Sequence, residues 1–456
     1  MMGSTREQKG GPHMSSRTHC SHLLPIAHRL LLLALVAWLL AGAVGCQPGT
    51  GDPVVPGARR QAGSSRPRPT PLPASIRFAY ASDGSSDLGA LVAEFNEHYP
   101  MITVELVPKV ERELRVLRAE TADVMETYPS AIPELVERGA IRDLDPWMTR
   151  DESFDRDDVY ESALDLYRAD GKTWAIPQGI DPLVVHYNGD LFDERGVAHP
   201  DANWDLDAFL ATASAVRDAE HTVYGYAYGL PSWSFDSHLF VYRHGGALID
   251  DWHAPTRATF ARVENVEALE WWSQLSARYD VAPSPDVAME AFGGNKASTL
   301  FYGIARGQVG MWIDLYSLRE GRDRPTPWTF TQGIAPLPRD ERAVTLAMGY
   351  TMGYVISSAT PHADACWEWL YFLSHRLPPH TVPARRSLIA SEAYAREVGE
   401  EAAAVAHTVM EGEILYHDRS HAFNEFKGFG DAIDHITSGF LSPKEAMEWA
   451  QTQAGR

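Results

Sequence analysis

Two acidic side chains, Asp181 and Asp314, stand at the ends of predicted strands, where they could do chemistry on a small molecule. A pair of carboxylates can act as general acid and base on a glycosidic bond. The same groups can instead accept hydrogen bonds from the hydroxyls of a bound solute. The chain carries no Gly-x-Ser-x-Gly, His-Glu-x-x-His, Gly-x-Gly-x-x-Gly or P-loop motif, so the sequence favours binding over catalysis.

Other polar or aromatic residues also follow predicted strands, and ligands of open α/β sheets bind beyond those strand ends. They are Asp83, Ser85, Tyr128, Gln178 and Tyr350. For several of these residues the sequence also allows a structural role. The first two could cap the next helix, Tyr128 could pack in the core, and Gln178 with Asp181 could serve a chain crossing. Trp312 lies within its strand, so we expect it in the core.

The elements that would position these side chains alternate between strand and helix. Residues 76–80 and 102–106 alternate apolar and polar types, and residues 88–95 place apolar side chains at helical spacing. This order predicts a βαβ unit and therefore a parallel sheet. Further strands are predicted at residues 174–177, 183–187, 309–313 and 351–356, and further helices at residues 132–138, 206–218, 263–279 and 361–374. Residues 442–445 (SPKE) predict a capping box at the start of a last helix.

The start of the chain predicts export. An apolar run at residues 30–44 follows Arg17 and Arg29 and ends at Cys46, the layout of a secretory signal. Gly45-Cys46 resembles a bacterial lipobox, although Ala43 stands where such motifs usually carry Leu. We therefore predict a signal peptide at residues 1–45, a lipidated Cys46 and a Pro-, Gly- and Ser-rich tether through residue 74. Plain secretion and an uncleaved anchor stay open as alternatives.

The composition and net charge of the chain exclude some classes of ligand. The chain has 456 residues, with 40 basic against 61 acidic side chains and a net charge of −21. Such a surface repels nucleic acid and anionic lipid headgroups, so neither is expected as a ligand. Cys366 is the one cysteine of the predicted globular part, so no disulfide is expected there. The spacing of the histidines predicts no metal site, and no motif predicts a cofactor.

Five stretches, taken in order, resemble the sugar-binding group of the extracellular solute-binding proteins of bacterial ABC importers. They are residues 91–105 (beginning LVAEFNEHYP), 139–146 (GAIRDLDP), 171–205 (beginning GKTWAIP), 307–313 (GQVGMWI) and 333–373 (beginning GIAPLP). Together they extend over nearly the whole predicted globular part. The sequence departs from the family before the third strand, where Gly-x-Ala-Pro-Asp is replaced by residues 120–123 (ETAD).

The resemblance implies an α/β, two-lobed periplasmic-binding-protein-like fold in which each lobe is an α/β sandwich and hinge crossings join the two. We expect one lobe to comprise residues 75–182 plus 350–380, and the other residues 183–349 plus 381–456. The crossings are expected near residues 180–183, 349–353 and 377–383. The lobes would close on a ligand bound between them.

The resemblance also adds two candidate residues and a ligand class. Trp233 lies where the family often places an aromatic platform, and Arg386 lies where it often has a basic residue facing the cleft, although Arg385 could take that role. Aromatic plates beside carboxylates and amides suit a sugar, which has an apolar ring face and directional hydroxyls.

The resemblance therefore implies a monomeric, non-enzymatic protein that binds a carbohydrate, is held outside the cytoplasm by its lipid and delivers the ligand to an ABC permease. Two alternatives remain: a surface glycoside hydrolase that uses Asp181 and Asp314, and a binding protein for another solute, such as a polyamine or a glycerophosphodiester.

Overall fold

The computed structural model describes most of the chain after residue 72. The described residues are 73–81, 88–109, 122–218, 220, 222–228, 235–251, 255–295, 298–321, 328–343, 346–416 and 427–455. All of these described residues belong to one compact unit. The signal peptide, Cys46 and nearly all of the predicted tether lie outside the described residues.

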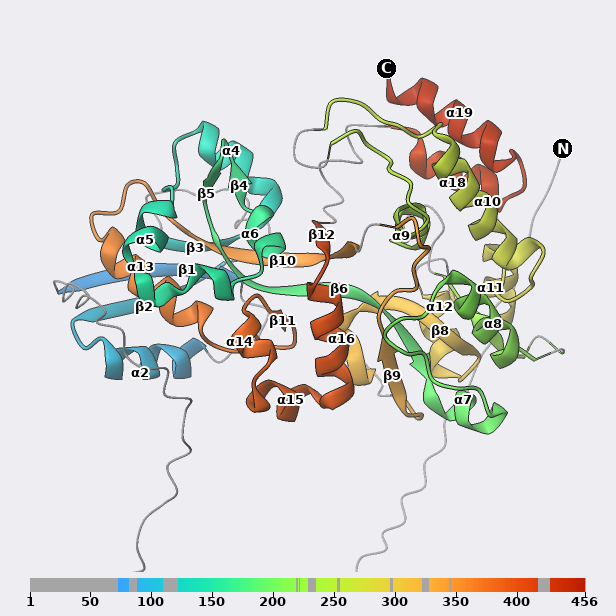
Figure 1. Cartoon of the computed structure of the whole chain (residues 1–456), viewed down its shortest axis with the longest axis horizontal. Helices are drawn as coiled ribbons and strands as arrows, with labels where there is room; N and C mark the ends of the chain where they lie inside the picture. Colours follow the sequence, from blue (N-terminus) through green and yellow to red (C-terminus); the bar gives the residue numbers. More distant parts are fainter. Residues whose placement is uncertain are drawn as a thin grey trace, which may run out of the picture. The chain divides into compact units, whose positions relative to one another are not determined.

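The first elements form the βαβ unit that the sequence predicts (Figure 1). In chain order they are β1 (Ala74–Ala81), α2 (Leu88–His98), β2 (Ile102–Lys109) and β3 (Val124–Thr127). β1 pairs in parallel with both β2 and β3, as expected. Leu88 and Phe95 of α2 are buried because their spacing places them on one helix face.

Short elements follow before the chain reaches the middle of the sheet. They are η1 (Pro129–Ala131), α4 (Ile132–Glu137), α5 (Asp145–Arg150), η2 (Glu152–Phe154), η3 (Arg156–Asp158), α6 (Glu161–Asp165), β4 (Arg168–Ala169), β5 (Lys172–Thr173) and β6 (Ile176–Asn188). β4 and β5 pair with each other as a separate two-stranded sheet.

β6 is one strand of 13 residues where the sequence predicts two. Its first half pairs with β10 (Leu346–Ile356) and β11 (Val382–Pro383). Its second half pairs with β8 (Val309–Leu315) and β9 (Gln332–Ala335). The pairing with β10 ends at Pro182 and the pairing with β8 begins at Leu183, so the proline stands where the ladder changes partner and does not end the strand. Figure 1 shows β6 running from one group of strands into the other.

The main sheet is mixed, not purely parallel. Its order is β2-β1-β3-β10-β6-β8-β7, with β9 and β11 also on β6 and β12 on β10. β10 runs antiparallel to both β3 and β6, so the parallel arrangement predicted from the first unit holds only for part of the sheet. β7 (Tyr224–Tyr226) pairs in parallel with β8, and β12 (Glu413–Tyr416) in parallel with β10.

The helices predicted at residues 206–218, 263–279 and 361–374 are present among the elements that follow β6. The elements are α7 (Gly189–Arg195), α8 (Leu206–Val216), α9 (Phe235–Arg243), α10 (Val263–Ala277), α11 (Pro285–Phe292), α12 (Thr299–Ala305), η4 (Tyr316–Gly321), α13 (Ala363–Ser374), α14 (Arg386–Ile389), α15 (Glu392–Val398), α16 (Glu400–Met410), α18 (Phe429–Thr437) and α19 (Pro443–Ala454). The capping box at α19 is confirmed: Ser442 and Glu445 cap each other's backbone N–H.

Two large groups of buried side chains form the core. The first cluster surrounds β1, α2 and α13 and includes Phe78, Phe95 and Trp369. The second cluster surrounds α8, α9 and α10 and includes Phe240 and Trp272. Ten buried apolar side chains between Val382 and Met410 belong to the first cluster, whereas the predicted boundaries assign all of residues 381–456 to the second lobe. α18 and α19 do pack in the second cluster.

Candidate functional site

Asp181 is held in a defined position in the middle of β6. The backbone N–H of Ser317, at the start of η4, donates to its Oδ1 at 2.8 Å, and the Ser317 hydroxyl donates to its Oδ2 at 2.7 Å. η4 follows directly on β8, so one side chain connects two segments that are far apart in the sequence. The carboxylate lies where β6 passes from β10 to β8.

The surroundings of Asp181 change its acidity. Burial, together with the smaller effect of the negative charge of Asp314, raises the pKa of Asp181 to about 7, against the effect of the two Ser317 hydrogen bonds. The positive charge of Arg319 acts in the opposite direction. Asp181 therefore exchanges its proton near neutral pH, and it can donate or accept a hydrogen bond according to the pH.

Four of the candidates predicted from the sequence gather on three neighbouring strands. Tyr350 of β10 lies directly opposite Asp181 in the pairing register. Asp314 of β8 lies opposite Val184, and its charge acts on Asp181. The side chain of Gln178 is hydrogen-bonded to the hydroxyl of Tyr354, which lies four pairs further along β10 than Tyr350. We call Gln178, Asp181, Asp314 and Tyr350 the Asp181 group.

Tyr128 lies at a separate strand end. It follows β3, is half-buried and holds the N-terminal position of η1 with an extended backbone. Trp312 is buried and stacks on His186 with ring centroids 5.7 Å apart, which confirms the core position expected for it. Asp83, Ser85 and Trp233 lie outside the described residues, as does Cys46.

The two neighbouring arginines have different surroundings. Arg385 is buried and donates to the backbone oxygens of Ser374 and Phe154, and it forms an ion pair with Asp158 at 3.2 Å. The described contacts of Arg385 are therefore structural.

Arg386 is exposed and contacts different partners. Its guanidinium donates to Glu411 Oε1 at 3.1 Å and stacks over the ring of Tyr160 at 4.0 Å. These contacts place the side chain beside the end of α16. The described contacts of Arg386 therefore do not link it to the Asp181 group.

Sequence reasoning missed Ser317, although a usable signal was present. The residue lies only three positions after Asp314, just beyond the end of the same strand, and it supplies two hydrogen bonds to Asp181. The strand-end rule that selected Asp314 would have included it.

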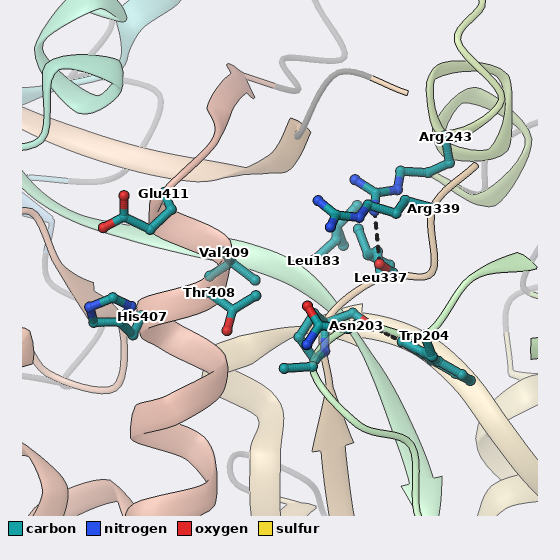
Figure 2. Close-up of a pocket in the computed structure, with 12 residues that line it drawn as sticks. Leu183, Asn203, Trp204, Arg243, Leu337, Arg339, His407, Thr408, Val409 and Glu411 are labelled. Atoms are coloured by element: carbon teal, nitrogen blue, oxygen red, sulfur yellow. Dashed lines mark hydrogen bonds between the residues drawn. The ribbon is translucent and has the colours of Figure 1, made fainter. Parts of the chain in front are cut away.

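Sequence reasoning also missed a pocket of about 310 Å³ beside Leu183 (Figure 2). One wall is the end of α16 with His407, Thr408, Val409 and Glu411. The remaining lining residues are Leu183, Ala202, Asn203, Trp204, Arg243, Pro336, Leu337 and Arg339. We call this cavity the α16 pocket; none of the predicted site residues lines it.

Two kinds of feature are absent from the described residues. Within them, no group of three or more His, Cys, Asp or Glu side chains is arranged to hold a metal ion. None of the described helices has both the length and the hydropathy needed to cross a bilayer.

Comparison with known proteins gives a family match over most of the described part. The model of the bacterial extracellular solute-binding protein family matches residues 81–374. A binding protein of Brucella abortus (strain 2308) is 24% identical over 244 residues, which is 53% of this chain and 55% of that protein. The match thus extends over about half the length of this relative. The erythritol/L-threitol-binding protein of Mycolicibacterium smegmatis is 33% identical over 110 residues, 21% of this chain and 23% of the relative.

Solved structures share the fold over almost their full length. An ABC substrate-binding protein of Listeria monocytogenes, in complex with cycloalternan, has a TM-score of 0.64 at 20% identity and covers 84% of this chain and 98% of its own. A solute-binding protein of an ABC transporter from Agrobacterium radiobacter K84, in complex with ribitol, has a TM-score of 0.60 at 19% identity and covers 84% and 99%. The chain therefore has the two-lobed fold of these proteins.

Proposed function

Because the chain belongs to the bacterial extracellular solute-binding proteins, we propose that it captures a carbohydrate or polyol between its two lobes and delivers it to an ABC importer. The observation that carries the proposal is the Asp181 group. It places two carboxylates, an amide and a phenol on adjacent strands where β6 leaves one set of partners for another. A hydroxylated ligand needs directional acceptors and donors of this kind.

The ligands of related proteins support the same class. Cycloalternan and ribitol are both polyhydroxylated, and so are erythritol and threitol, which name the Mycolicibacterium relative. Because they range from a four-carbon polyol to a cyclic oligosaccharide, they support the class without selecting one compound.

The proposal includes location and partners. The family is extracellular, and we propose that Cys46 carries the lipid that holds the chain to the membrane, as a monomer beside its permease. Changing Cys46 to Ser should release the chain from the membrane fraction, and retention there would contradict lipidation.

We also propose that the ligand leaves unaltered. The alternative is hydrolysis by Asp181 and Asp314, because a carboxyl group with a pKa of about 7 beside a second carboxylate is also the arrangement of an acid and base pair. The two functions differ in whether the chain hydrolyses its ligand. Release of reducing ends from oligosaccharides by the purified chain would support the hydrolase and contradict simple binding.

The experiment that tests binding is a thermal-shift screen followed by scattering. Linear polyols, monosaccharides and oligosaccharides form one panel, and putrescine and glycerophosphocholine represent the alternative solutes. A ligand at 100 times its Kd stabilises the folded state by about 2.7 kcal/mol, which is a measurable rise in Tm. Small-angle scattering should then show compaction with the selected ligand. Stabilisation by putrescine or glycerophosphocholine alone would overturn the carbohydrate proposal.

A further inference from the structure

The turn η4 leaves the second cluster and enters the first. It follows β8, whose Ile313 belongs to the second cluster, whereas Tyr316 at the start of η4 is buried in the first cluster. The Tyr316 hydroxyl donates to the backbone oxygen of Ala402 in α16 at 3.1 Å and is hydrogen-bonded to the Tyr394 hydroxyl at 2.9 Å. η4 is therefore a fixed part of the boundary between the clusters, beside the point on β6 where Asp181 lies.

Arg319 lies on the same turn, two residues after Ser317, and only 3% of it is exposed. Its Nη1 donates to the backbone oxygens of His380 at 2.8 Å and Tyr316 at 3.2 Å, and its guanidinium carbon lies 4.4 Å from the centre of the Tyr316 ring. His380 belongs to the chain crossing expected near residues 377–383. Arg319 therefore connects η4 to this crossing, while Ser317 connects the same turn to the crossing of β6.

Two of the three guanidinium nitrogens of Arg319 have no hydrogen-bond partner. Nε and Nη2 are buried without one, and the two bonds of Nη1 go to neutral carbonyls. Within the part of the chain that the structure describes, no carboxylate is hydrogen-bonded to Arg319. A buried charge without a hydrogen-bonded counter-ion is unfavourable for folding, so we expect the charge of Arg319 to have a function.

The charge of Arg319 acts on the carboxyl group of Asp181. Burial raises the pKa of Asp181 and the negative charge of Asp314 on β8 adds to this effect, whereas the charge of Arg319, besides the hydrogen bonds from η4, lowers it. Two phenols are also near: Tyr350 lies opposite Asp181 on β10, and Tyr316 begins η4. Arg319 therefore favours the charged form of Asp181 where burial and Asp314 favour the neutral form.

We propose that Arg319 is a positioning residue of the solute site, which holds η4 against both crossings and, with Ser317, keeps Asp181 oriented and charged to accept a hydrogen bond from a solute hydroxyl. Hydrogen bonds to a charged acceptor are stronger than those to a neutral one. Because its guanidinium is buried, Arg319 acts through Asp181 and does not touch the solute. The proposal rests on the proposed function, in which Asp181 contacts the solute.

The first measurement uses the full chain and needs no solute. The carboxyl carbon of Asp181 is titrated by ¹³C NMR and identified by the signal that Asp181→Asn removes. Arg319→Gln keeps a donor for the His380 carbonyl but removes the charge, so the midpoint for Asp181 should rise from about 7 by roughly half a pH unit or more. Arg319→Lys, which keeps the charge, should raise the midpoint less.

Arg142→Gln is the matched control. Arg142 is half-buried and, like Arg319, donates to backbone oxygens, in this case three in the segment that follows β10. None of these contacts reaches η4 or Asp181. The variant removes the same charge and the same kind of hydrogen bond, so it should lower Tm while the midpoint for Asp181 stays where it is in the unmodified chain.

The second measurement adds the polyol or sugar found in the thermal-shift screen. Calorimetry between pH 6 and 9 gives the solute affinity of each chain as a function of pH. Because the charged form of Asp181 is the acceptor, affinity should follow its ionised fraction. The affinity profile of Arg319→Gln should therefore move to higher pH by the same amount as its NMR midpoint, and that of Arg142→Gln should not move.

An Arg319→Gln chain that loses its fold at pH 8 should still fold at pH 5, where the protonated Asp181 needs no counter-charge. A chain unfolded at both pH values would show that Arg319 is needed for packing whatever the state of Asp181, and would overturn the proposal. An equal midpoint in all chains, or equal shifts for Arg319→Gln and Arg142→Gln, would also overturn it. If the midpoint moves as expected but no compound in the screen binds, the proposed function fails, and the proposal for the solute site fails with it. An unmoved midpoint in a chain that does bind the solute contradicts the role of Arg319 alone.

Discussion

The Asp181 group and the α16 pocket both adjoin β6 near its change of partners, but they are built in different ways. The first consists of side chains on strands that pair directly, with Asp181 opposite Tyr350. The second is assembled from a helix end, two loops and the end of α9. One is dominated by carboxylates and the other by guanidinium groups, so a single crossing strand adjoins two sites of opposite charge.

This difference suggests a division of roles at the crossing. A carboxylate buried beside a second carboxylate is costly to ionise, and the pKa of Asp181 is about 7 even though the Ser317 hydrogen bonds and the positive charge of Arg319 lower it. Arg243 remains charged over the physiological range even though burial lowers its pKa to about 10. The first site should therefore respond to pH near neutrality and the second should not.

The largest expected effect is on the pH dependence of stability. In the unfolded chain Asp181 should titrate near its ordinary pKa of about 3.9, and in the folded chain it titrates near 7. Between these values the folded state holds a proton that the unfolded state has lost, so stability falls as pH rises through the window and levels off above it. The loss has an upper limit of roughly 4 kcal/mol.

Asp181→Asn should flatten that part of the profile, because the amide cannot ionise. Denaturant unfolding at several values between pH 4 and 8, for the variant and the unmodified chain, measures the difference. If both chains lose stability in parallel, another group is responsible and Asp181 is not the pH-sensitive residue.

The next effect is on solute affinity and separates the two sites directly. Asp181→Ala should weaken binding of the polyol or sugar found in the screen by roughly 10- to 100-fold, since hydrogen bonds to a charged group contribute about 1.5–3 kcal/mol. Arg339→Ala should leave the same affinity within about twofold. Calorimetry on both variants measures the two affinities. A larger loss of solute affinity for Arg339→Ala than for Asp181→Ala would place the solute in the α16 pocket and not at the Asp181 group.

Much of the fold could be predicted because apolar spacing is a local property. α2, α8, α10 and α13 follow from it, and the cap at Ser442 follows from residue types at fixed offsets. The continuity of β6 could not be predicted from Pro182, because a proline ends a strand only where it interrupts a ladder. The location of that change of partners depends on β8 and β10, which are more than 120 residues away.

The same contrast between local patterns and long-range packing explains which parts of the candidate site could be predicted. The Asp181 group could be predicted because each member stands in or at the end of a strand that is recognisable in the sequence. Arg386 could not be assigned, since only the packing of Arg385 against Phe154 shows which of the two faces outward. The α16 pocket left no signal, because residues near 203, 243, 337 and 408 share no spacing and meet only in the folded chain.

A smaller effect concerns the wall of the α16 pocket. The hydroxyl of Tyr187 on β6 donates to Glu401 Oε1 of α16 at 2.8 Å. Tyr187→Phe should lower the free energy of unfolding by about 1 kcal/mol, since the lost acceptor is exposed and regains water.

Glu401→Gln, which keeps an acceptor for the Tyr187 hydroxyl, should cost less than Tyr187→Phe in the same denaturant titration. A larger loss for Glu401→Gln would mean that the charge of Glu401, and not the bond to β6, secures α16.

The smallest effect is expected for Arg386→Ala. Arg386 and Glu411 are about half exposed, so their ion pair and the contact with Tyr160 should contribute less than about 1 kcal/mol to stability. Arg138→Ala, which breaks a comparably exposed pair with Glu134, is the matched control. Solute affinity should not change, because the described contacts of Arg386 do not reach the Asp181 group. Weaker solute binding in calorimetry would instead return Arg386 to the solute site.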